Sequence, residues 1–302
     1  MPFQHLPSLI ATLTALLLAG CATISSITST QATAPSTTKQ AAAKPVKIGI
    51  ALGGGAARGF AHIGVIKVLE AQGITPDVII GTSAGAVVGA LYAAGNNGFE
   101  LQKLAHKLDE TKFSDWSVPD RGVLKGEGLQ KFVNDAVANR PIEALKKPFA
   151  AVATDLNSGD GILFRNGNTG MAVRASATVP GVFQPVKING REYVDGGLAN
   201  LVPVRYARQM GADIVIAVDI SAVPNKQPVK GTMDILLQTF TIMGQNMARY
   251  ELKEADVVIR PQVGNLSSTD FQARHDAILE GEKAAQAALP KIREAIRKAS
   301  GG

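Results

Sequence analysis

A serine held between two glycines is the feature that most constrains what this chain can fold into. Ser83 lies in Gly81-Thr82-Ser83-Ala84-Gly85, after an apolar stretch at 77–80 that predicts a strand and before a small-residue stretch at 84–94 that predicts a helix. A serine on so sharp a turn leaves no room for side chains two residues before and after it, so glycine is needed at both positions. The pattern therefore predicts an exposed nucleophile at a helix N-terminus, where the helix dipole favours developing negative charge.

A second glycine-rich turn follows another predicted strand. Gly53-Gly54-Gly55 comes directly after the apolar residues 46–52 and before a predicted helix. Backbone N–H groups in such a loop bind anions. Arg58 stands where a dinucleotide fingerprint requires glycine, and the Lys and Ser/Thr of a P-loop are absent, so a nucleotide phosphate is a poor candidate. We expect an oxyanion hole instead, with the amides of Gly54 and Gly55 directed at the tetrahedral intermediate formed when Ser83 attacks an ester.

A general base for Ser83 has to come from farther along the chain. Asp195 follows a short predicted strand and precedes Gly196-Gly197, two glycines that leave its carboxylate approachable. The same Asp-Gly pair is common in simple hairpin turns, so the residues alone leave both interpretations open. Burial beside an acyl chain would raise the pKa of this carboxyl and make it a stronger base for a serine hydroxyl.

Other acidic residues and the histidines offer alternatives for the base. Asp155 and Asp219 each stand at the end of a predicted strand. A triad of Ser83, Asp219 and His275 would follow the chain order Ser, Asp, His that one class of triad hydrolases uses. Two other histidines lie beyond the N-terminal segment. We expect His62 at a packing position and His106 at the surface.

Apolar stretches that predict buried strands alternate with helical patterns along residues 46–302. This alternation is typical of a three-layer α/β/α domain with a mostly parallel central sheet. The expected strands are 46–52, 77–80, 149–154, 214–218 and 257–259. The expected helices are 60–71, 84–94, 128–138, 203–210, 233–254 and 282–298. The last of these is basic and amphipathic, which favours a solvated outer helix over a membrane-facing one.

The N-terminal segment has the pattern of an export signal. The first 20 residues contain no Asp, Glu, Lys or Arg, and the apolar stretch 9–20 is too short to cross a bilayer as a helix. It ends in Leu18-Ala19-Gly20-Cys21, and Cys21 is the only cysteine, which excludes an intramolecular disulfide. This ending resembles the bacterial lipoprotein signal, which implies cleavage before Cys21 and a diacylglyceryl group on its thiol. Residues 1–20 are thus expected to be a signal peptide.

The residues after Cys21 indicate where the protein is located, and its net charge indicates which partners it can bind. Residues 21–45, rich in Ser, Thr, Ala and Pro, are expected to form the lipidated cysteine and a flexible tether to the membrane. Ala22 replaces the Asp that retains many lipoproteins at the inner membrane, which favours the periplasmic side of the outer membrane. The net charge of +6 suits an anionic membrane surface, but no Lys/Arg run with interleaved aromatic residues appears, so nucleic acid is not an expected partner.

In combination, these motifs resemble the patatin-like phospholipase family over residues 46–219. The glycine loop with Arg58, the Gly81–Gly85 turn and Asp195-Gly196-Gly197 carry the resemblance, and segments 153–157 and 174–183 match as well. The resemblance implies an α/β/α fold, a Ser–Asp dyad without histidine, and hydrolysis of lipid acyl esters without a metal or other cofactor. By position it makes Ser83 the nucleophile, Asp195 the base and Gly53–Gly55 the oxyanion loop.

The expected function is therefore hydrolysis of phospholipid or lysophospholipid esters through an acyl-enzyme. Arg58 and the glycines beside Ser83 and Asp195, namely Gly81, Gly85, Gly196 and Gly197, are expected to support these residues. Two alternatives stay open from the residues alone. One is an esterase or thioesterase of the triad type, and the other is a non-catalytic lipoprotein that organises a membrane.

Overall fold

The computed structural model describes residues 45–108, 122–223, 231–264, 266 and 270–301. The chain divides into two units, 1–42 and 43–302, and every described residue belongs to the second. The expected signal peptide, Cys21 and almost all of the tether lie outside the described residues.

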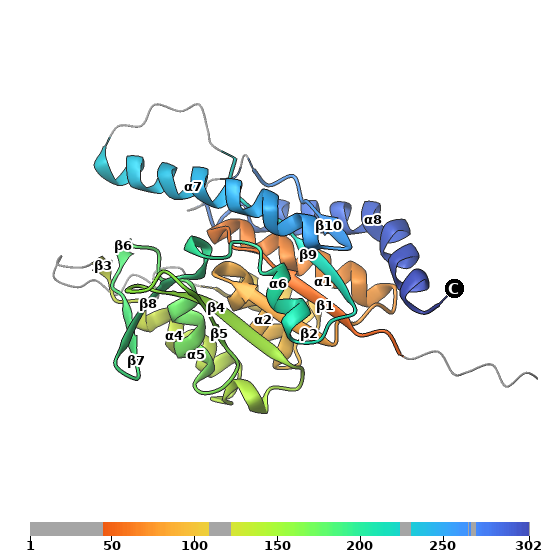
Figure 1. Cartoon of the computed structure of the whole chain (residues 1–302), viewed down its shortest axis with the longest axis horizontal. Helices are drawn as coiled ribbons and strands as arrows, with labels where there is room; N and C mark the ends of the chain where they lie inside the picture. The colour runs from red at the N-terminus through yellow and green to blue at the C-terminus, as the bar shows by residue number, and fades with distance from the viewer. Residues whose placement is uncertain (1–44, 109–121, 224–230, 265, 267–269, 302) are drawn as a thin grey trace, which may run out of the picture. The chain divides into compact units, whose positions relative to one another are not determined.

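A central eight-stranded sheet organises the described residues (Figure 1). Its strands are β1 (Ile48–Leu52), β2 (Val78–Thr82), β4 (Phe149–Asp155), β5 (Gly161–Phe164), β7 (Val186–Ile188), β8 (Arg191–Asp195), β9 (Ile214–Val218) and β10 (Val257–Ile259). Five of them run parallel in the order β10-β9-β1-β2-β4. Strands β5 and β8 each pair with β4 in antiparallel orientation, and β7 pairs antiparallel with β8. Two short strands, β3 (Gly122–Leu124) and β6 (Gly181–Phe183), pair with each other apart from this sheet.

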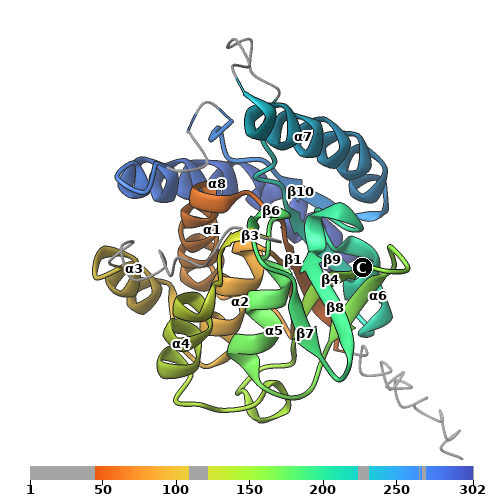
Figure 2. The ribbon, with the colours of Figure 1, turned by 90° about the vertical axis from the view of Figure 1, so that its left-hand side faces the viewer.

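Helices cover both faces of the sheet. One face is covered by α1 (Phe60–Ala71), α2 (Ala84–Ala93), α3 (Gly98–His106), α4 (Glu127–Ala136), α5 (Thr169–Ser176) and α8 (Arg274–Ala299). The other face is covered by α6 (Val204–Gln209) and the C-terminal end of α7 (Thr232–Glu251). Figure 2 shows α1, α2 and α8 on one side of the sheet and α6 on the other. The three-layer α/β/α architecture predicted from the sequence is therefore confirmed.

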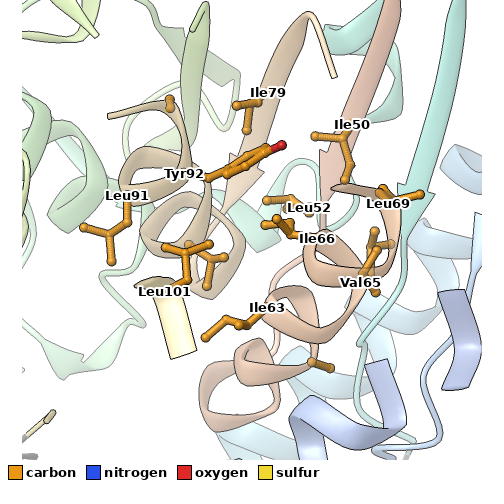
Figure 3. Close-up of a cluster of buried hydrophobic side chains, with 14 of the residues drawn as sticks. Ile50, Leu52, Ile63, Val65, Ile66, Leu69, Ile79, Leu91, Tyr92 and Leu101 are labelled. Carbon is orange, nitrogen blue, oxygen red and sulfur yellow. The ribbon is translucent and has the colours of Figure 1, made fainter. Parts of the chain in front are cut away.

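Two apolar cores explain why the parallel strands are apolar along most of their length. In β1, Ile50 and Leu52 point into the core shared with α1 and α2, whereas Ala51 belongs to the core under α6. Side chains alternate between the faces of a strand, so a strand buried on both faces needs apolar residues at every position. Figure 3 shows the larger core, in which isoleucine and leucine side chains of β1 and β2 meet those of α1, α2 and α3.

Helices α1 and α8 approach each other so closely that each contributes a glycine to the contact. A Cβ atom at Gly64 would lie 1.9 Å from the carbonyl oxygen of Ile278, and one at Gly281 would lie 2.0 Å from the carbonyl oxygen of Ala61. Both distances are far below any van der Waals contact. Only glycine permits this crossing, which ties the C-terminal helix to the start of α1.

The predicted elements mostly match the observed ones to within a few residues. The exception is the C-terminal helix, predicted over 282–298, which begins at Arg274 and ends at Ala299. Its apolar face includes Ala277 and Ile278, which are buried against α1. The helix is therefore an outer element with one buried face, and its first two turns were missed because Gly281 and the charged residues around it weaken the apolar pattern.

Candidate active site

Strand β4 brings Ser83 and Asp195 together. Val152 of β4 pairs with Thr82, the last residue of β2, and the next residue, Ala153, pairs with Asp195, the last residue of β8. Because β5 occupies the opposite edge of β4, strands β2 and β8 meet end to end along one edge. Ser83, one residue beyond Thr82, therefore lies beside Asp195.

Ser83 has a strained backbone at the sharp turn between β2 and α2. Its φ is 53° and its ψ is −120°, values that non-glycine residues rarely adopt, and its side chain is half-buried. A Cβ at Gly81 would lie 2.3 Å from the carbonyl oxygen of Gly85, and a Cβ at Gly85 would lie 2.1 Å from that of Leu52. The predicted need for glycine on both sides of the serine is confirmed.

The Asp195 carboxylate is buried and interacts with Ser83. It accepts a hydrogen bond from the Ser83 side chain, and its Oδ1 accepts one from the N–H of Gly197 at 2.7 Å. Burial raises the pKa of Asp195 to about 6, against the opposing effect of these two hydrogen bonds. Gly196 cannot be replaced without a clash, because a Cβ there would lie 2.0 Å from the carbonyl oxygen of Val152.

Buried hydroxyl residues fix the backbone around the pair. The N–H of Ser83 donates to Ser176 Oγ at 2.9 Å, and the Thr154 hydroxyl donates to the carbonyl oxygen of Asp195 at 2.8 Å. The N–H of Asp195 donates to the carbonyl oxygen of Thr178 at 2.7 Å. Ser176 and Thr178 lie in the segment 174–183 that matched the family pattern, but no local sequence pattern indicated these roles.

The glycine loop lies next to Ser83, but its hydrogen bonds correct the predicted oxyanion donors. A Cβ at Gly54 would lie 3.3 Å from Ser83 Cβ. The N–H of Gly53 donates to the carbonyl oxygen of Val218, and that of Gly54 donates to the carbonyl oxygen of Leu201, both at 3.0 Å. These two amides are engaged by backbone carbonyls and are not free for an oxyanion.

Two other amides near Ser83 remain available. Within the described residues, the N–H of Gly55 and that of Ala84, the first residue of α2, have no acceptor. Gly59 keeps the two helix starts in contact, since a Cβ there would lie 2.7 Å from Ala84 Cβ. The loop and the N-terminus of α2 thus present, beside Ser83, two N–H donors that no described residue accepts.

Arg58 and His62 are buried next to the glycine loop. Arg58 is buried, and its guanidinium donates to the carbonyl oxygens of Ile220 and Leu266, each at 3.2 Å. His62 is fully buried, its Nε2 lies 2.8 Å from the carbonyl oxygen of Gly53, and burial lowers its pKa to about 4. A neutral His62 therefore donates to Gly53, which agrees with the expected packing position.

The competing acid–base residues are occupied elsewhere. Asp219 binds Ser221 through Oδ1 and Arg260 through Oδ2, and His275 is exposed on α8 with no hydrogen bond to either Ser83 or Asp219. Among the described residues, the geometry thus gives no support to a Ser83–Asp219–His275 triad. His106 is exposed as expected.

Asp155 has a structural role at the end of β4. Its Oδ1 accepts hydrogen bonds from the N–H groups of Asn157 and Ser158, and Arg191 lies 3.3 Å from its Oδ2. The two backbone hydrogen bonds are the largest cause of its lowered pKa. The carboxylate therefore closes the turn into β5 and leaves Asp195 as the acid beside Ser83.

Helix α7 passes over this site and exposes an apolar surface beside it. Leu201 Cδ1 would lie 3.0 Å from a Cβ at Gly54, while Leu201 Cδ2 would lie 3.0 Å from one at Gly244 of α7. Between 235 and 248 the helix has no charged residue. Its exposed apolar side chains are Met233, Ile235, Leu236, Leu237, Ile242 and Met243.

The described residues contain neither a membrane-spanning helix nor a metal-binding cluster. In this part of the chain, no helix combines the length and hydropathy that a membrane span needs. No group of three or more His, Cys, Asp or Glu side chains is placed there to hold a metal ion.

Comparison with known proteins identifies the class that this fold and site define. The family model described as patatin-like phospholipase matches residues 50–208, which include the glycine loop, Ser83 and Asp195. The chain belongs to the patatin-like phospholipase family. This membership supports lipid acyl hydrolase activity in general terms, without specifying the substrate.

Several curated proteins are similar to this chain in sequence. An uncharacterized NTE family protein of Mycobacterium tuberculosis (strain ATCC 25618 / H37Rv) is 37% identical over 194 residues, which are 62% of this chain and 53% of that protein. A second one from the same strain is 30% identical over 280 residues, covering 83% of this chain and 48% of that protein. Patatin-like phospholipase domain-containing protein 6 of Mus musculus is 33% identical over 58% of this chain and 14% of its own length. The chain thus spans about half the length of the two mycobacterial relatives. It spans a much smaller part of the mouse protein.

A solved structure shares the fold. VipD from Legionella pneumophila superposes with a TM-score of 0.55 at 14% identity, covering 82% of this chain and 67% of that protein. At this identity the similarity concerns the fold alone.

Proposed function

We propose that the chain is a serine acyl hydrolase that cleaves carboxylic esters of phospholipids or lysophospholipids through a Ser83–Asp195 dyad. The observation that carries this proposal is the hydrogen bond between the Ser83 side chain and a buried carboxylate whose pKa is raised to about 6. Such a carboxylate is ionised at neutral pH, yet it is a stronger base than an ordinary Asp. Family membership supports the lipid class of the substrate.

In the proposed reaction, Asp195 accepts the hydroxyl proton as Ser83 Oγ attacks the ester carbonyl carbon. The intermediate collapses by breaking the bond between the acyl carbon and the alcohol oxygen, and Asp195 gives its proton to the departing alcohol. A water then attacks the acyl-enzyme, Asp195 takes the proton of this water, and Ser83 regains a proton as the fatty acid leaves. The N–H groups of Gly55 and Ala84 are the donors we assign to the oxyanion.

The test is release of fatty acid from mixed phospholipid and lysophospholipid micelles by the full-length chain. We expect Ser83→Ala to abolish release and Asp195→Asn to lower kcat by about 10²–10⁴-fold, because the hydroxyl then lacks its base. Thermal unfolding of both variants serves as the control for folding. His275→Ala should keep full activity.

Each alternative has its own outcome in this experiment. If His275→Ala is as inactive as Ser83→Ala, a triad replaces the dyad. If the parent chain releases no fatty acid and does not react with a serine-directed fluorophosphonate, the non-catalytic lipoprotein becomes the better interpretation and the proposal fails.

We also propose that residues 1–20 are removed as a signal peptide and that Cys21 carries a lipid anchor. The pattern Leu18-Ala19-Gly20-Cys21 supports this proposal, and Ala22 favours the outer membrane on its periplasmic side. An anchor would keep residues 46–302 beside the lipids that they are proposed to hydrolyse.

A further inference from the structure

A groove with two arginines lies at the carboxyl ends of the parallel strands, the same end of the sheet as Ser83. It lies between the C-terminal half of α7 and the segments that follow β9 and β10, and its volume is about 470 Å³. We call it the arginine groove. Its polar lining residues are Asp219, Ser221, Gln245, Arg249, Arg260 and Gln262.

The positive charge of the arginine groove is only partly neutralised. Arg260 Nε lies 3.1 Å from Asp219 Oδ2, whereas its terminal nitrogens have no acceptor among the described residues. Arg249 is exposed and pairs with no acidic side chain in the described part of the chain. Two arginines therefore face one aspartate, and their terminal N–H groups are available to an anion with one negative charge.

The sheet register sets how far the arginine groove lies from the nucleophile. Leu52 of β1 pairs with Val218 on one side and with Gly81 on the other, so these three residues are level across the sheet. Asp219 and Ser83 follow the ends of strands that have one strand, β1, between them. Neighbouring strands are about 4.8 Å apart, which puts the two residues roughly 10 Å apart across the sheet.

That separation matches the internal spacing of one class of lipid. In a glycerophospholipid, about six covalent bonds of roughly 1.5 Å connect the acyl carbonyl carbon to the phosphorus, and a hydrogen bond of about 2.8 Å then reaches a guanidinium group. An ester at Ser83 thus places its phosphate within reach of the groove. A neutral acylglycerol has no group that uses these N–H donors.

We propose that the arginine groove binds the phosphodiester of a glycerophospholipid or lysophospholipid whose acyl ester lies at Ser83. This assignment rests on the proposed function and gives its substrate class a physical basis: phosphate-bearing esters are preferred to neutral ones. Gln245 and Gln262 supply further hydrogen-bond donors at the rim.

The activity test compares two micellar substrates with the same acyl chain, lysophosphatidylglycerol and monoacylglycerol. We expect Arg249→Gln and Arg260→Gln each to lower kcat/KM for lysophosphatidylglycerol about tenfold, since each removes a charge-assisted hydrogen bond, and to leave the monoacylglycerol rate unchanged. Arg165→Gln is the matched control, because Arg165 is an exposed arginine that does not line the groove. Equal losses on both substrates, or no loss on either, would overturn the assignment.

A binding test separates failure of this assignment from failure of the proposed function. Soluble glycerophosphoglycerol and, separately, inorganic phosphate are titrated into the full-length chain by calorimetry, which needs no catalysis. We expect glycerophosphoglycerol to bind the parent and Arg165→Gln but not the Arg249→Gln/Arg260→Gln double variant. Binding of inorganic phosphate alone would assign the groove to a free phosphate and overturn the lipid assignment, as would equal binding by the double variant. If the parent chain binds glycerophosphoglycerol but does not react with fluorophosphonate, the proposed serine hydrolase chemistry is rejected and the groove assignment stands.

Discussion

At the scale of single residues, the candidate site combines a serine with a strained backbone and a buried acid. The positive φ of Ser83 is held by its N–H bond to Ser176 and by the two glycines that let α2 begin so close to β2. The cost of burying Asp195 appears as a pKa of about 6 rather than the ordinary 3.8. Both features cost folding free energy in exchange for reactivity, as is common at catalytic sites.

The raised pKa of Asp195 predicts that activity and stability change in opposite directions with pH. The folded state holds the proton more tightly than the unfolded state does, so this carboxyl stabilises the fold below about pH 4 and loses that contribution as pH rises through about 6. Over the same window the carboxylate form becomes populated, and kcat/KM should rise to a plateau above pH 6. Fatty acid release and urea unfolding, each followed from pH 4 to pH 8, check the two trends.

Asp195→Asn should therefore be more stable than the parent at pH 8, by about 1–3 kcal/mol, and equal to it near pH 4. The amide oxygen can still accept the hydrogen bond from the Gly197 N–H, so little else is lost. Asp160→Asn, at an exposed position, is the control and should not move the urea midpoint at either pH. A variant that is destabilised at pH 8 would contradict the burial argument.

At the scale of elements, the C-terminal helix supports the site without touching it. Helix α8 packs on α1 through Gly281 and Gly64, and α1 carries His62, which binds the carbonyl oxygen of Gly53. The loop at 200–202 makes a second connection, since Glu251 at the end of α7 accepts hydrogen bonds from Asn200 Nδ2 and the Val202 N–H. The glycine loop is thus held from both faces of the sheet.

We predict that Gly281→Ala lowers the free energy of unfolding by about 1–3 kcal/mol, because the new methyl group forces α8 away from the backbone of Ala61. Urea denaturation measures this loss. Gln286→Ala, on the exposed face of the same helix, should leave the midpoint within a few tenths of a kcal/mol. An unchanged midpoint for Gly281→Ala would show that the helices can separate at no cost.

At the scale of the whole molecule, sequence patterns predicted the parts of the site that depend on local sterics. The Ser83 turn and its glycines could be recognised because their requirement lies within five consecutive residues. The choice of Asp195 over Asp155 depended on the family resemblance, since only the pairing of β4 with β2 and β8 distinguishes them. The oxyanion donors could not be assigned from sequence, because the carbonyls of Val218 and Leu201 that engage Gly53 and Gly54 come from distant segments.

The proposed N-terminal anchor also concerns the whole molecule, and it predicts that Cys21 carries covalent lipid. Cells that express the full chain with radiolabelled palmitate should yield labelled protein, and Cys21→Ser should remove both the label and the sedimentation with membranes. Ser83→Ala, which leaves the N-terminus intact, is the control and should keep the label. Label that persists in Cys21→Ser would reject the anchor.

The meeting of β2 and β8 along one edge of β4 has a consequence for how the protein is made. Ser83 leaves the ribosome long before Asp195, and the two residues become neighbours only after β8 has paired beyond the end of β2. A partly synthesised or misfolded chain therefore carries Ser83 without the carboxylate that we propose as its base. Covalent labelling of Ser83 would then count the molecules that have completed their long-range pairing, which circular dichroism, sensitive to helices formed locally, does not.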